Sequence, residues 1–371
     1  MRSNATVRSS TGSRAVSWAR HSCAAAGVAA ALAPAAVAGN VDFPRFPAIS
    51  PDGDAITFSW RGDIFYAPID ADALREPTIP AKRLTNHPLD ELYSTFMPDG
   101  PGRSDAIVFT SEQTGYTNLF SINTDGSDLR QITDTDRFFI PNQVAAVGAP
   151  AAGDGAGGVK VIGHSAREGD VYRPGIRPYT ADLETGLIER IHDAFGLFPS
   201  ASPDGRYVTF TRGSSDWDRR HYRGPDSRDV WLYDTLDGSF DRLTDWAGND
   251  GMARWRDGDT ITFLSDRELD TVNLYQADLT PEGVVEAGSI RRLTSFDGRD
   301  VQWYDVSQDG RAAVLHVWDT LYLLDLRRSA PPRELSITAA EDFRDNVRLN
   351  SVDTDVTDAA LSPDGKVMAY V

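Results

Sequence analysis

The chain has 371 residues, of which 40% are hydrophobic and 25% charged, enough for one large or two ordinary domains with cores of their own. Its net charge of -18 argues against nucleic acid as a partner, because affinity for phosphates comes from cations. The long apolar run, roughly Cys23 to Ala38, is too short and too rich in alanine for a membrane span, so we expect none.

Residues 1–38 have the pattern of a secretory signal peptide. Four arginines without any acidic residue precede an apolar stretch, which ends in Ala36-Val37-Ala38. A basic region, an apolar region and an A-x-A site are typical of such segments, so we expect cleavage near Ala38 and a secreted or periplasmic protein. The alternative is a disordered basic arm. Cleavage would remove Cys23, the single cysteine, and leave the fold to be held by its core without disulfides.

From residue 39 onward, a pattern of about fifty residues repeats along the chain. Most units contain a turn of the Ser-Pro-Asp-Gly type, in which Pro fixes φ and Gly accepts a positive φ, so that each turn joins two strands. Clear copies begin at Ser50, Ser202 and Ser362, and degenerate copies at Met97, Arg256 and Ser307. Two alternating strands follow each turn, and a closing strand ends in Arg-Leu-Thr or a relative, at Thr85, Thr133, His192, Thr244, Thr294 and Ser336.

Four short strands per unit in six units predict an all-β fold, a six-bladed β-propeller over residues 39–337 with four-stranded antiparallel blades. The alternatives are an open array and a β-sandwich. Blade three is the weakest copy, because a glycine-rich stretch, 148–158, replaces its turn. Its G-x-G-x-x-G spacing lacks the flanking strand and helix of a dinucleotide site. After an acidic linker, 338–357, the pattern restarts at 358–371, as the first strands of a second, truncated propeller.

The sequence contains no constellation typical of catalysis. Histidines lie far apart, without metal-ligand spacing, and the nearest approach to a nucleophile elbow, Gly163–Arg167, lacks the second glycine and the following helix. We therefore expect no catalytic, cofactor-binding or metal-binding residues. We also expect that this chain alone hydrolyses no peptide, since acyl transfer needs a nucleophile, a base and oxyanion donors together.

One insertion in blade four, residues 213–228, combines basic and aromatic residues in an otherwise acidic protein. Arginines recognise carboxylates with charge-assisted hydrogen bonds, so we predict a contact surface for a peptide carboxylate or a neighbouring domain. The alternative is that these arginines pair with aspartates next to them, as surface arginines commonly do. The residues that we expect to make the contact are Trp217, Arg219, Arg220, Tyr222 and Arg223.

Several segments resemble the N-terminal propeller of tricorn-type proteases: YRGPDSRDVWLYD (222–234), FDRLTDWAGNDGMARW (240–255), DTITFLSDRELDTVNLY (259–275), RRLTSFDGRDVQW (291–303) and the restart ALSPDGK. The resemblance implies a second propeller, a PDZ-like module and a serine peptidase core further along the full-length protein, with catalytic residues beyond Val371. It also implies that the propellers admit and guide peptides. The signal segment resembles the secreted bacterial branch of the family.

Two functions follow from these observations. In the first, the chain is the substrate gate and recruitment domain of a serine peptidase that degrades oligopeptides, with a central channel that filters extended peptides. In the second, it is a non-enzymatic periplasmic interaction module, similar to the propeller of the Tol system. That type usually has a small domain before its propeller and no restart after it, so we favour the first. Self-association into a homo-oligomer stays open.

Overall fold

The computed structural model describes residues 37–98, 105–148, 158–167, 175–217, 219–268, 270–341, 358–366 and 368–370. The predicted signal segment up to residue 36, most of the glycine-rich stretch (149–157) and most of the predicted linker (342–357) lie outside the described residues. The described part is all-β, with a single 3-10 turn, η1 (Ala73–Arg75). It contains no helix with the length and hydropathy needed to span a bilayer.

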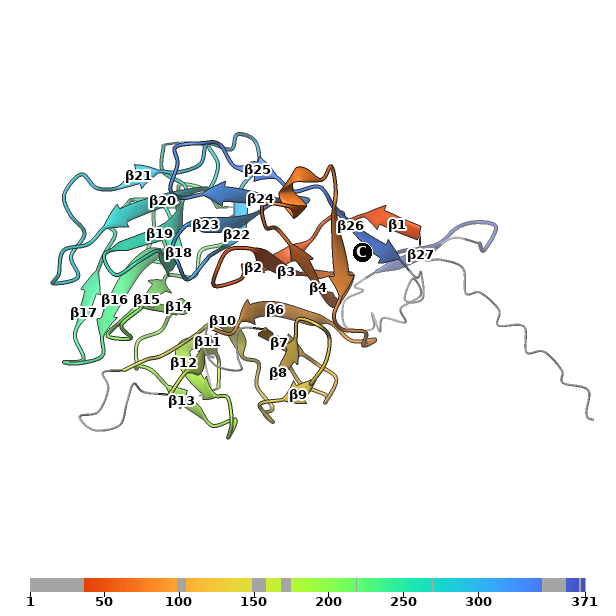
Figure 1. The fold of residues 1–371 in the computed structure, drawn as a ribbon, viewed down its shortest axis with the longest axis horizontal. Helices are drawn as coiled ribbons and strands as arrows, with labels where there is room; N and C mark the ends of the chain where they lie inside the picture. Colours follow the sequence, from red (N-terminus) through yellow and green to blue (C-terminus); the bar gives the residue numbers. More distant parts are fainter. Residues whose placement is uncertain are drawn as a thin grey trace, which may run out of the picture. The chain divides into compact units, whose positions relative to one another are not determined.

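Six sheets, each with four consecutive antiparallel strands, form the blades of a six-bladed propeller, as predicted (Figure 1). Blades one to three contain β2 (Arg45–Ile49), β3 (Ala55–Trp60), β4 (Asp63–Pro68) and β5 (Ile79–Arg83); β6 (Glu91–Phe96), β7 (Ala106–Ser111), β8 (Asn118–Asn123) and β9 (Arg130–Gln131); and β10 (Ile140–Ala145), β11 (Lys160–Ser165), β12 (Arg177–Asp182) and β13 (Ile188–Arg190). Blades four to six contain β14 (Leu197–Ala201), β15 (Tyr207–Arg212), β16 (Asp229–Asp234) and β17 (Phe240–Arg242); β18 (Asp250–Trp255), β19 (Thr260–Ser265), β20 (Asn273–Asp278) and β21 (Arg291–Arg292); and β22 (Val301–Val306), β23 (Ala312–Val317), β24 (Thr320–Asp325) and β25 (Arg333–Glu334).

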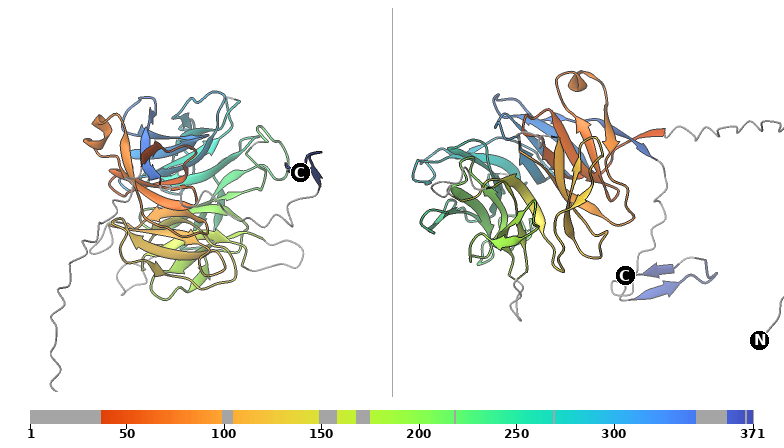
Figure 2. Two further views of the ribbon diagram at one scale, coloured as in Figure 1. Left: turned by 90° about the vertical axis from the view of Figure 1, so that its right-hand side faces the viewer. Right: turned by 60° about the horizontal axis from the view of Figure 1, so that its bottom comes forward.

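The ring is closed by side-chain packing at every blade interface. Buried apolar residues of the described part form six clusters, and each cluster joins two neighbouring blades. Figure 2 shows the blades from two further directions. One of them packs Val314 and Leu321 of blade six against Ile49 and Phe58 of blade one. The smallest joins Ile162 of blade three to blade four. An open array would leave one such interface unmade, so the clusters establish closure.

Second strands are buried on both faces although their sequences alternate. In β3, Ile56 and Phe58 lie in apolar clusters, while Thr57 on the opposite face is also fully buried. Its Oγ1 lies 2.9 Å from Oγ of Ser94 in blade two. A blade packed between two others has no face toward solvent. The alternation along its second strand therefore places apolar side chains against one neighbouring blade and small polar side chains against the other.

The turns have the chemistry that their sequence predicts. The Ser50 hydroxyl donates to Asp52 Oδ1 at 2.6 Å and accepts the backbone N–H of Ala55 at 2.9 Å, while Gly53 has φ of +72°. The turns that begin at Ser202 and Ser307 repeat these hydrogen bonds. A serine, an aspartate and a glycine thus fix each turn by local bonds, which explains why the motif recurs.

The closing threonines satisfy a backbone donor of the third strand. Oγ1 of Thr85, Thr133, Thr244 and Thr294 accepts the N–H of the second residue of that strand at 2.9–3.0 Å. Blade three has His192 in this place, and there the second residue of the strand is Pro178, which has no N–H to satisfy. The exception in the repeat therefore follows from a missing donor.

A substitution tests this role. In Thr294→Val, the buried N–H of Leu274 loses its acceptor and Asn273 Oδ1 loses a donor, so we expect the free energy of unfolding to fall by about 1–3 kcal/mol. Ser336 ends the corresponding strand of blade six but is exposed, and Ser336→Ala should change stability by less than about 0.5 kcal/mol. Urea unfolding measures both. Equal losses in the two variants would contradict the assigned role.

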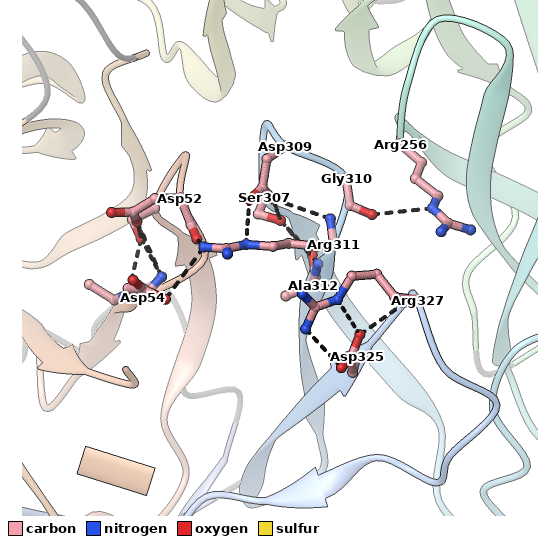
Figure 3. A network of polar contacts seen from close by, with 12 residues as sticks. Asp52, Asp54, Arg256, Ser307, Asp309, Gly310, Arg311, Ala312, Asp325 and Arg327 are labelled. Carbon is pink, nitrogen blue, oxygen red and sulfur yellow. Dashed lines mark hydrogen bonds and ion pairs between the residues drawn. The ribbon is translucent and has the colours of Figure 1, made fainter. Parts of the chain in front are cut away.

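The two ends of the ring are tied outside the four-stranded blades. After blade six, β26 (Ile337–Glu341) pairs in parallel with β5 of blade one, and β1 (Val37–Asn40) pairs antiparallel with β26. The blade-one sheet therefore has six strands and continues beyond residue 337. On the turn side, Arg311 of blade six donates to the Asp52 carbonyl and lies 3.5 Å from Asp54 (Figure 3). Both connections cover or fix blade one, whose outer edge would otherwise be unpaired.

The restart after the linker forms a two-stranded antiparallel hairpin of β27 (Ala359–Leu361) and β28 (Met368–Tyr370). Its turn has the same bond from Ser362 Oγ to Asp364 Oδ1, at 2.6 Å, and Gly365 has φ of +69°. The strands expected here are present. Their interpretation as the beginning of a second propeller stays a prediction.

Candidate functional site

The basic insertion of blade four lies on what we call the loop face, the end of the ring opposite the Ser-Pro-Asp-Gly turns. Consecutive antiparallel strands place the connections between second and third strands, and those between blades, at this end. The insertion is anchored on Asp266 of blade five, whose carboxylate accepts the N–H of His221 at 2.7 Å and Nδ2 of Asn249 at 3.0 Å. Asn249 Oδ1 in turn accepts the Ser215 hydroxyl. The insertion is therefore held by buried polar contacts across a blade interface.

Two basic side chains near this anchor, and the tryptophan between them, have structural partners. Arg228 is buried over the Trp217 ring at 4.7 Å and donates to the Ser215 carbonyl at 2.6 Å, and burial lowers its pKa to about 10. Trp217 itself packs against the cluster between blades five and six. Arg220 pairs with Asp300 at 2.7 Å. Neither Arg220 nor Arg228 uses the neighbouring aspartates in an ion pair within the described part of the chain.

Two cations of the insertion are uncommitted. Arg219 and Arg223 are exposed and have no ion-pair partner among the described residues, and the Arg219 guanidinium stacks on the Tyr222 ring at 4.0 Å. Of the five residues predicted to make a contact, the structure brings Arg219, Tyr222 and Arg223 to the surface. It gives Trp217 and Arg220 internal partners. The prediction of a contact surface thus rests on the first three.

The channel contains a feature that the sequence analysis missed. First strands of neighbouring blades pack against one another around the axis, and each has an irregular register near its loop-face end. Four non-glycine residues at these irregularities have φ between +50° and +55°: Phe46, Tyr93, Phe198 and Met252. Left-handed backbone costs an L-residue about 1–2 kcal/mol, so the surrounding structure maintains strain at four equivalent places.

The aromatic side chains at three of these positions meet Trp303 across the axis. The Trp303 ring of blade six lies 5.3 Å from Phe46 of blade one, 5.8 Å from Tyr93 of blade two and 5.8 Å from Phe198 of blade four, measured between ring centroids. Phe46 and Tyr93 lie 4.1 Å apart. Blades two, four and six alternate around the ring, so rings that connect them span the channel. We call Phe46, Tyr93, Phe198 and Trp303 the aromatic cluster.

Polar groups lie beside the aromatic cluster in the first strands. Arg254 is buried with its Nε 3.7 Å from Asp305, and burial raises the pKa of Asp305 to about 6 although Arg254 opposes this. His164 packs edge-on to Phe198 and lies 2.9 Å from Asn142 Oδ1, and burial lowers its pKa to about 3. The His164 imidazole beside the aromatic cluster is therefore neutral at physiological pH.

A sequence signal for the aromatic cluster does exist. Phe46, Tyr93, Phe198, Met252 and Trp303 each stand four residues before the first residue of their blade's turn. Only alignment of the units on their turns, followed by a search for large side chains at a fixed offset, would have found them. Blade three has no such turn to count from, and at its register irregularity it has the small polar residue Asn142.

The nearest approach to a nucleophile elbow has no catalytic geometry. His164 and Ser165 are adjacent in β11, so their side chains point to opposite faces, and the Ser165 hydroxyl donates to the Phe138 carbonyl. In the described residues, no group of three or more His, Cys, Asp or Glu side chains could hold a metal ion.

A second surface feature lies toward the turn side, between blades five and six. A crevice of about 860 Å³ is bordered by the outer strands of the two blades, including Arg291, Arg292, Arg327 and Arg328. Arg327 and Arg328 share Asp325, at 2.9 and 3.5 Å, and Arg292 pairs with Glu268 at 3.1 Å. Most of its cations are therefore already neutralised, in contrast to Arg219 and Arg223.

The closed ring and the Ser-Pro-Asp-Gly turns define a six-bladed β-propeller of four-stranded blades. The chain belongs to the family of tricorn protease N-terminal β-propeller domains, whose profile matches residues 42–330.

Solved structures agree with this fold. The crystal structure of the tricorn protease is 17% identical with a TM-score of 0.57, and the match covers 90% of this chain and 29% of that one. TolB from Acinetobacter baumannii is 17% identical with a TM-score of 0.51, over 81% of this chain and 65% of TolB. The chain thus spans less than a third of the tricorn protease structure. No curated protein sequence matches it.

Proposed function

We propose that this propeller recruits oligopeptides for a tricorn-type serine peptidase, whose catalysis is performed by another part of the full-length protein. Membership of the tricorn N-terminal propeller family is the observation that carries the proposal. Its partners would be peptides and the peptidase-bearing domains of the same protein, in a secreted or periplasmic location. We expected peptides to pass along the central channel, but the aromatic cluster occupies it. The proposed role is therefore recruitment of peptides at the surface of the propeller.

The charge distribution supports recruitment on the loop face. In a protein with net charge -18, Arg219 and Arg223 offer guanidinium groups without ion-pair partners in the described residues, beside an aromatic ring. Guanidinium groups bind carboxylates with charge-assisted hydrogen bonds, and aromatic rings add apolar contact area at little entropic cost. An extended peptide with an acidic group matches this combination.

The test is removal of Arg219 and Arg223 together with Arg220, the paired arginine between them. In the triple variant Arg219→Ala, Arg220→Ala, Arg223→Ala, we expect an acidic peptide to bind about tenfold more weakly at low salt and with a shallower salt dependence. Fluorescence anisotropy with a labelled acidic octapeptide measures both. The matched control removes the same charge at the crevice, in Arg291→Ala, Arg327→Ala, Arg328→Ala. Equal affinities in the two triple variants would contradict recruitment by the insertion.

The same assay separates the two functions that the sequence leaves open. A recruiting propeller should bind unstructured peptides and ignore folded proteins. An interaction module similar to the Tol propeller should bind a folded periplasmic protein and show no affinity for short peptides. The second result would replace the proposal.

A further inference from the structure

We infer that the loop-face end of the channel is a closed cup that binds an aromatic side chain of a peptide together with an adjacent carboxylate, and that peptides do not pass through this propeller. The inference deepens the proposed function and rests on it in taking a peptide as the ligand. Its basis is the aromatic cluster, the strained backbone beneath it and an uncommitted arginine at its edge.

The first step is that the aromatic cluster closes the channel. Trp303 contacts rings from blades one, two and four, and Met252 of blade five packs in the same cluster of side chains as Trp303 and Phe198. Five of the six blades therefore contribute a large side chain at one level of the axis. An extended peptide cannot pass while these side chains hold these positions, because its backbone needs the space that they fill.

The second step is that the cluster is accessible. Phe46, Tyr93, Phe198 and Trp303 are each half-buried, unlike the fully buried aromatic residues between the blades, such as Phe58 and Phe263. Phe46, Tyr93 and Phe198 adopt this arrangement with unfavourable left-handed φ values, which the surrounding structure maintains. A partly exposed set of four rings offers face and edge contacts to a further aromatic ring.

The third step concerns charge at the edge of the cup. Arg45 precedes Phe46, is exposed and has no ion-pair partner in the described part of the chain, and its charge acts on the Tyr93 hydroxyl and on His316. The cup thus combines apolar rings with a free guanidinium, which fits an aromatic residue beside a carboxylate. That carboxylate comes either from an acidic side chain or from the end of a peptide.

The experiment uses labelled hexapeptides and fluorescence anisotropy. One peptide ends in phenylalanine with a free carboxylate, the second is its amide, the third contains an internal Asp-Phe pair with an amidated end, and the fourth is the first with alanine in place of phenylalanine. We expect the first or the third to bind at least tenfold more tightly than both the amide and the alanine peptide. Which of the two binds identifies the source of the carboxylate.

Protein variants locate the site. Trp303→Ala should weaken binding of the preferred peptide at least tenfold, and Arg45→Gln should abolish the preference for a carboxylate. Trp318, an exposed tryptophan of the loop face without ring contacts to the cluster, provides the matched control, and Trp318→Ala should bind as the parent does. Thermal unfolding checks that each variant is folded, and the alanine peptide tests the same contact on the unmodified protein.

The outcomes are distinct. Peptide binding that ignores phenylalanine, Trp303 and Arg45 overturns the cup and leaves recruitment by the propeller in place. Absence of binding by every peptide, including the acidic octapeptide, overturns both. Binding that depends on phenylalanine and on both residues establishes the cup.

Discussion

Gly310→Ala is expected to lower the free energy of unfolding by about 2–5 kcal/mol. Gly310 has φ of +69°, and a Cβ at this position would lie 2.2 Å from the Arg256 carbonyl oxygen of the neighbouring blade. Alanine in left-handed backbone costs about 1–2 kcal/mol, and overpacking against backbone adds about 1–3 kcal/mol. The same turn accepts the Arg256 guanidinium at the Gly310 carbonyl, so a shift would also disturb this bond between blades (Figure 3). Urea unfolding of the purified chain measures the effect.

Equivalent glycines in other blades provide the controls. Gly53 has φ of +72° but no atom nearer than 3.6 Å to an added Cβ, so Gly53→Ala should show the backbone cost alone. Gly205 has φ of +73° and the Ala146 carbonyl oxygen at 3.0 Å, so Gly205→Ala should lie between the two. If the three glycine-to-alanine variants lost equal amounts of unfolding free energy, the neighbouring blades would not constrain the turns.

Arg267→Met is expected to cost about 3–5 kcal/mol at pH 8. Its guanidinium lies 2.5 Å from Asp250, which is fully buried, and stacks near the rings of Phe263 and Tyr275. Removal leaves an uncompensated carboxylate inside the ring, which is far more costly than loss of a surface pair. Substitution of both partners, Asp250→Asn with Arg267→Met, should recover most of the loss. Arg242 and Asp229 form a more exposed pair, and Arg242→Met should cost less than about 1 kcal/mol.

The loss in Arg267→Met should depend on pH. Burial raises the pKa of Asp250 to about 6, although Arg267 opposes this. A carboxyl group whose folded-state pKa is raised stabilises the fold when protonated, and that stability is lost as the pH rises from about 4 toward 6. Without Arg267 the pKa rises further, so the folded variant holds a neutral Asp250 at pH 5 and a buried charge at pH 8. Urea unfolding at both values should show the larger deficit at pH 8, and an equal or reversed deficit would contradict the assigned pair.

The fold could be predicted from the sequence because the same local chemistry repeats in most of the six units. In the turns that begin at Ser50, Ser202 and Ser307, serine and aspartate form hydrogen bonds within five residues. In four blades the closing threonine accepts a hydrogen bond from a strand of its own blade. Such short-range rules are visible in a single unit and are confirmed by their recurrence. The number of blades and the order of strands followed directly.

The partners across blades could not be predicted in this way. Arg220 pairs with Asp300, eighty residues away, although aspartates lie much nearer in the insertion. The aromatic cluster joins Trp303 to Phe46, Tyr93 and Phe198, which have left-handed backbone, and the strand pattern of a single unit does not indicate it. The pairing of β26 with β5 likewise depends on ring closure. These contacts are set by tertiary geometry, and they are the ones that distinguish a candidate site from a generic propeller.

The most direct measurement is photo-crosslinking of a peptide to the propeller, followed by mass spectrometry of the attached residues. A peptide with a photoreactive phenylalanine next to a carboxylate should attach to residues of the loop face, namely the first strands of blades one, two, four and six and the insertion around Tyr222. Unlabelled peptide should suppress the reaction. Attachment at the crevice between blades five and six, or at random over the surface, would contradict recruitment of peptides by the loop face.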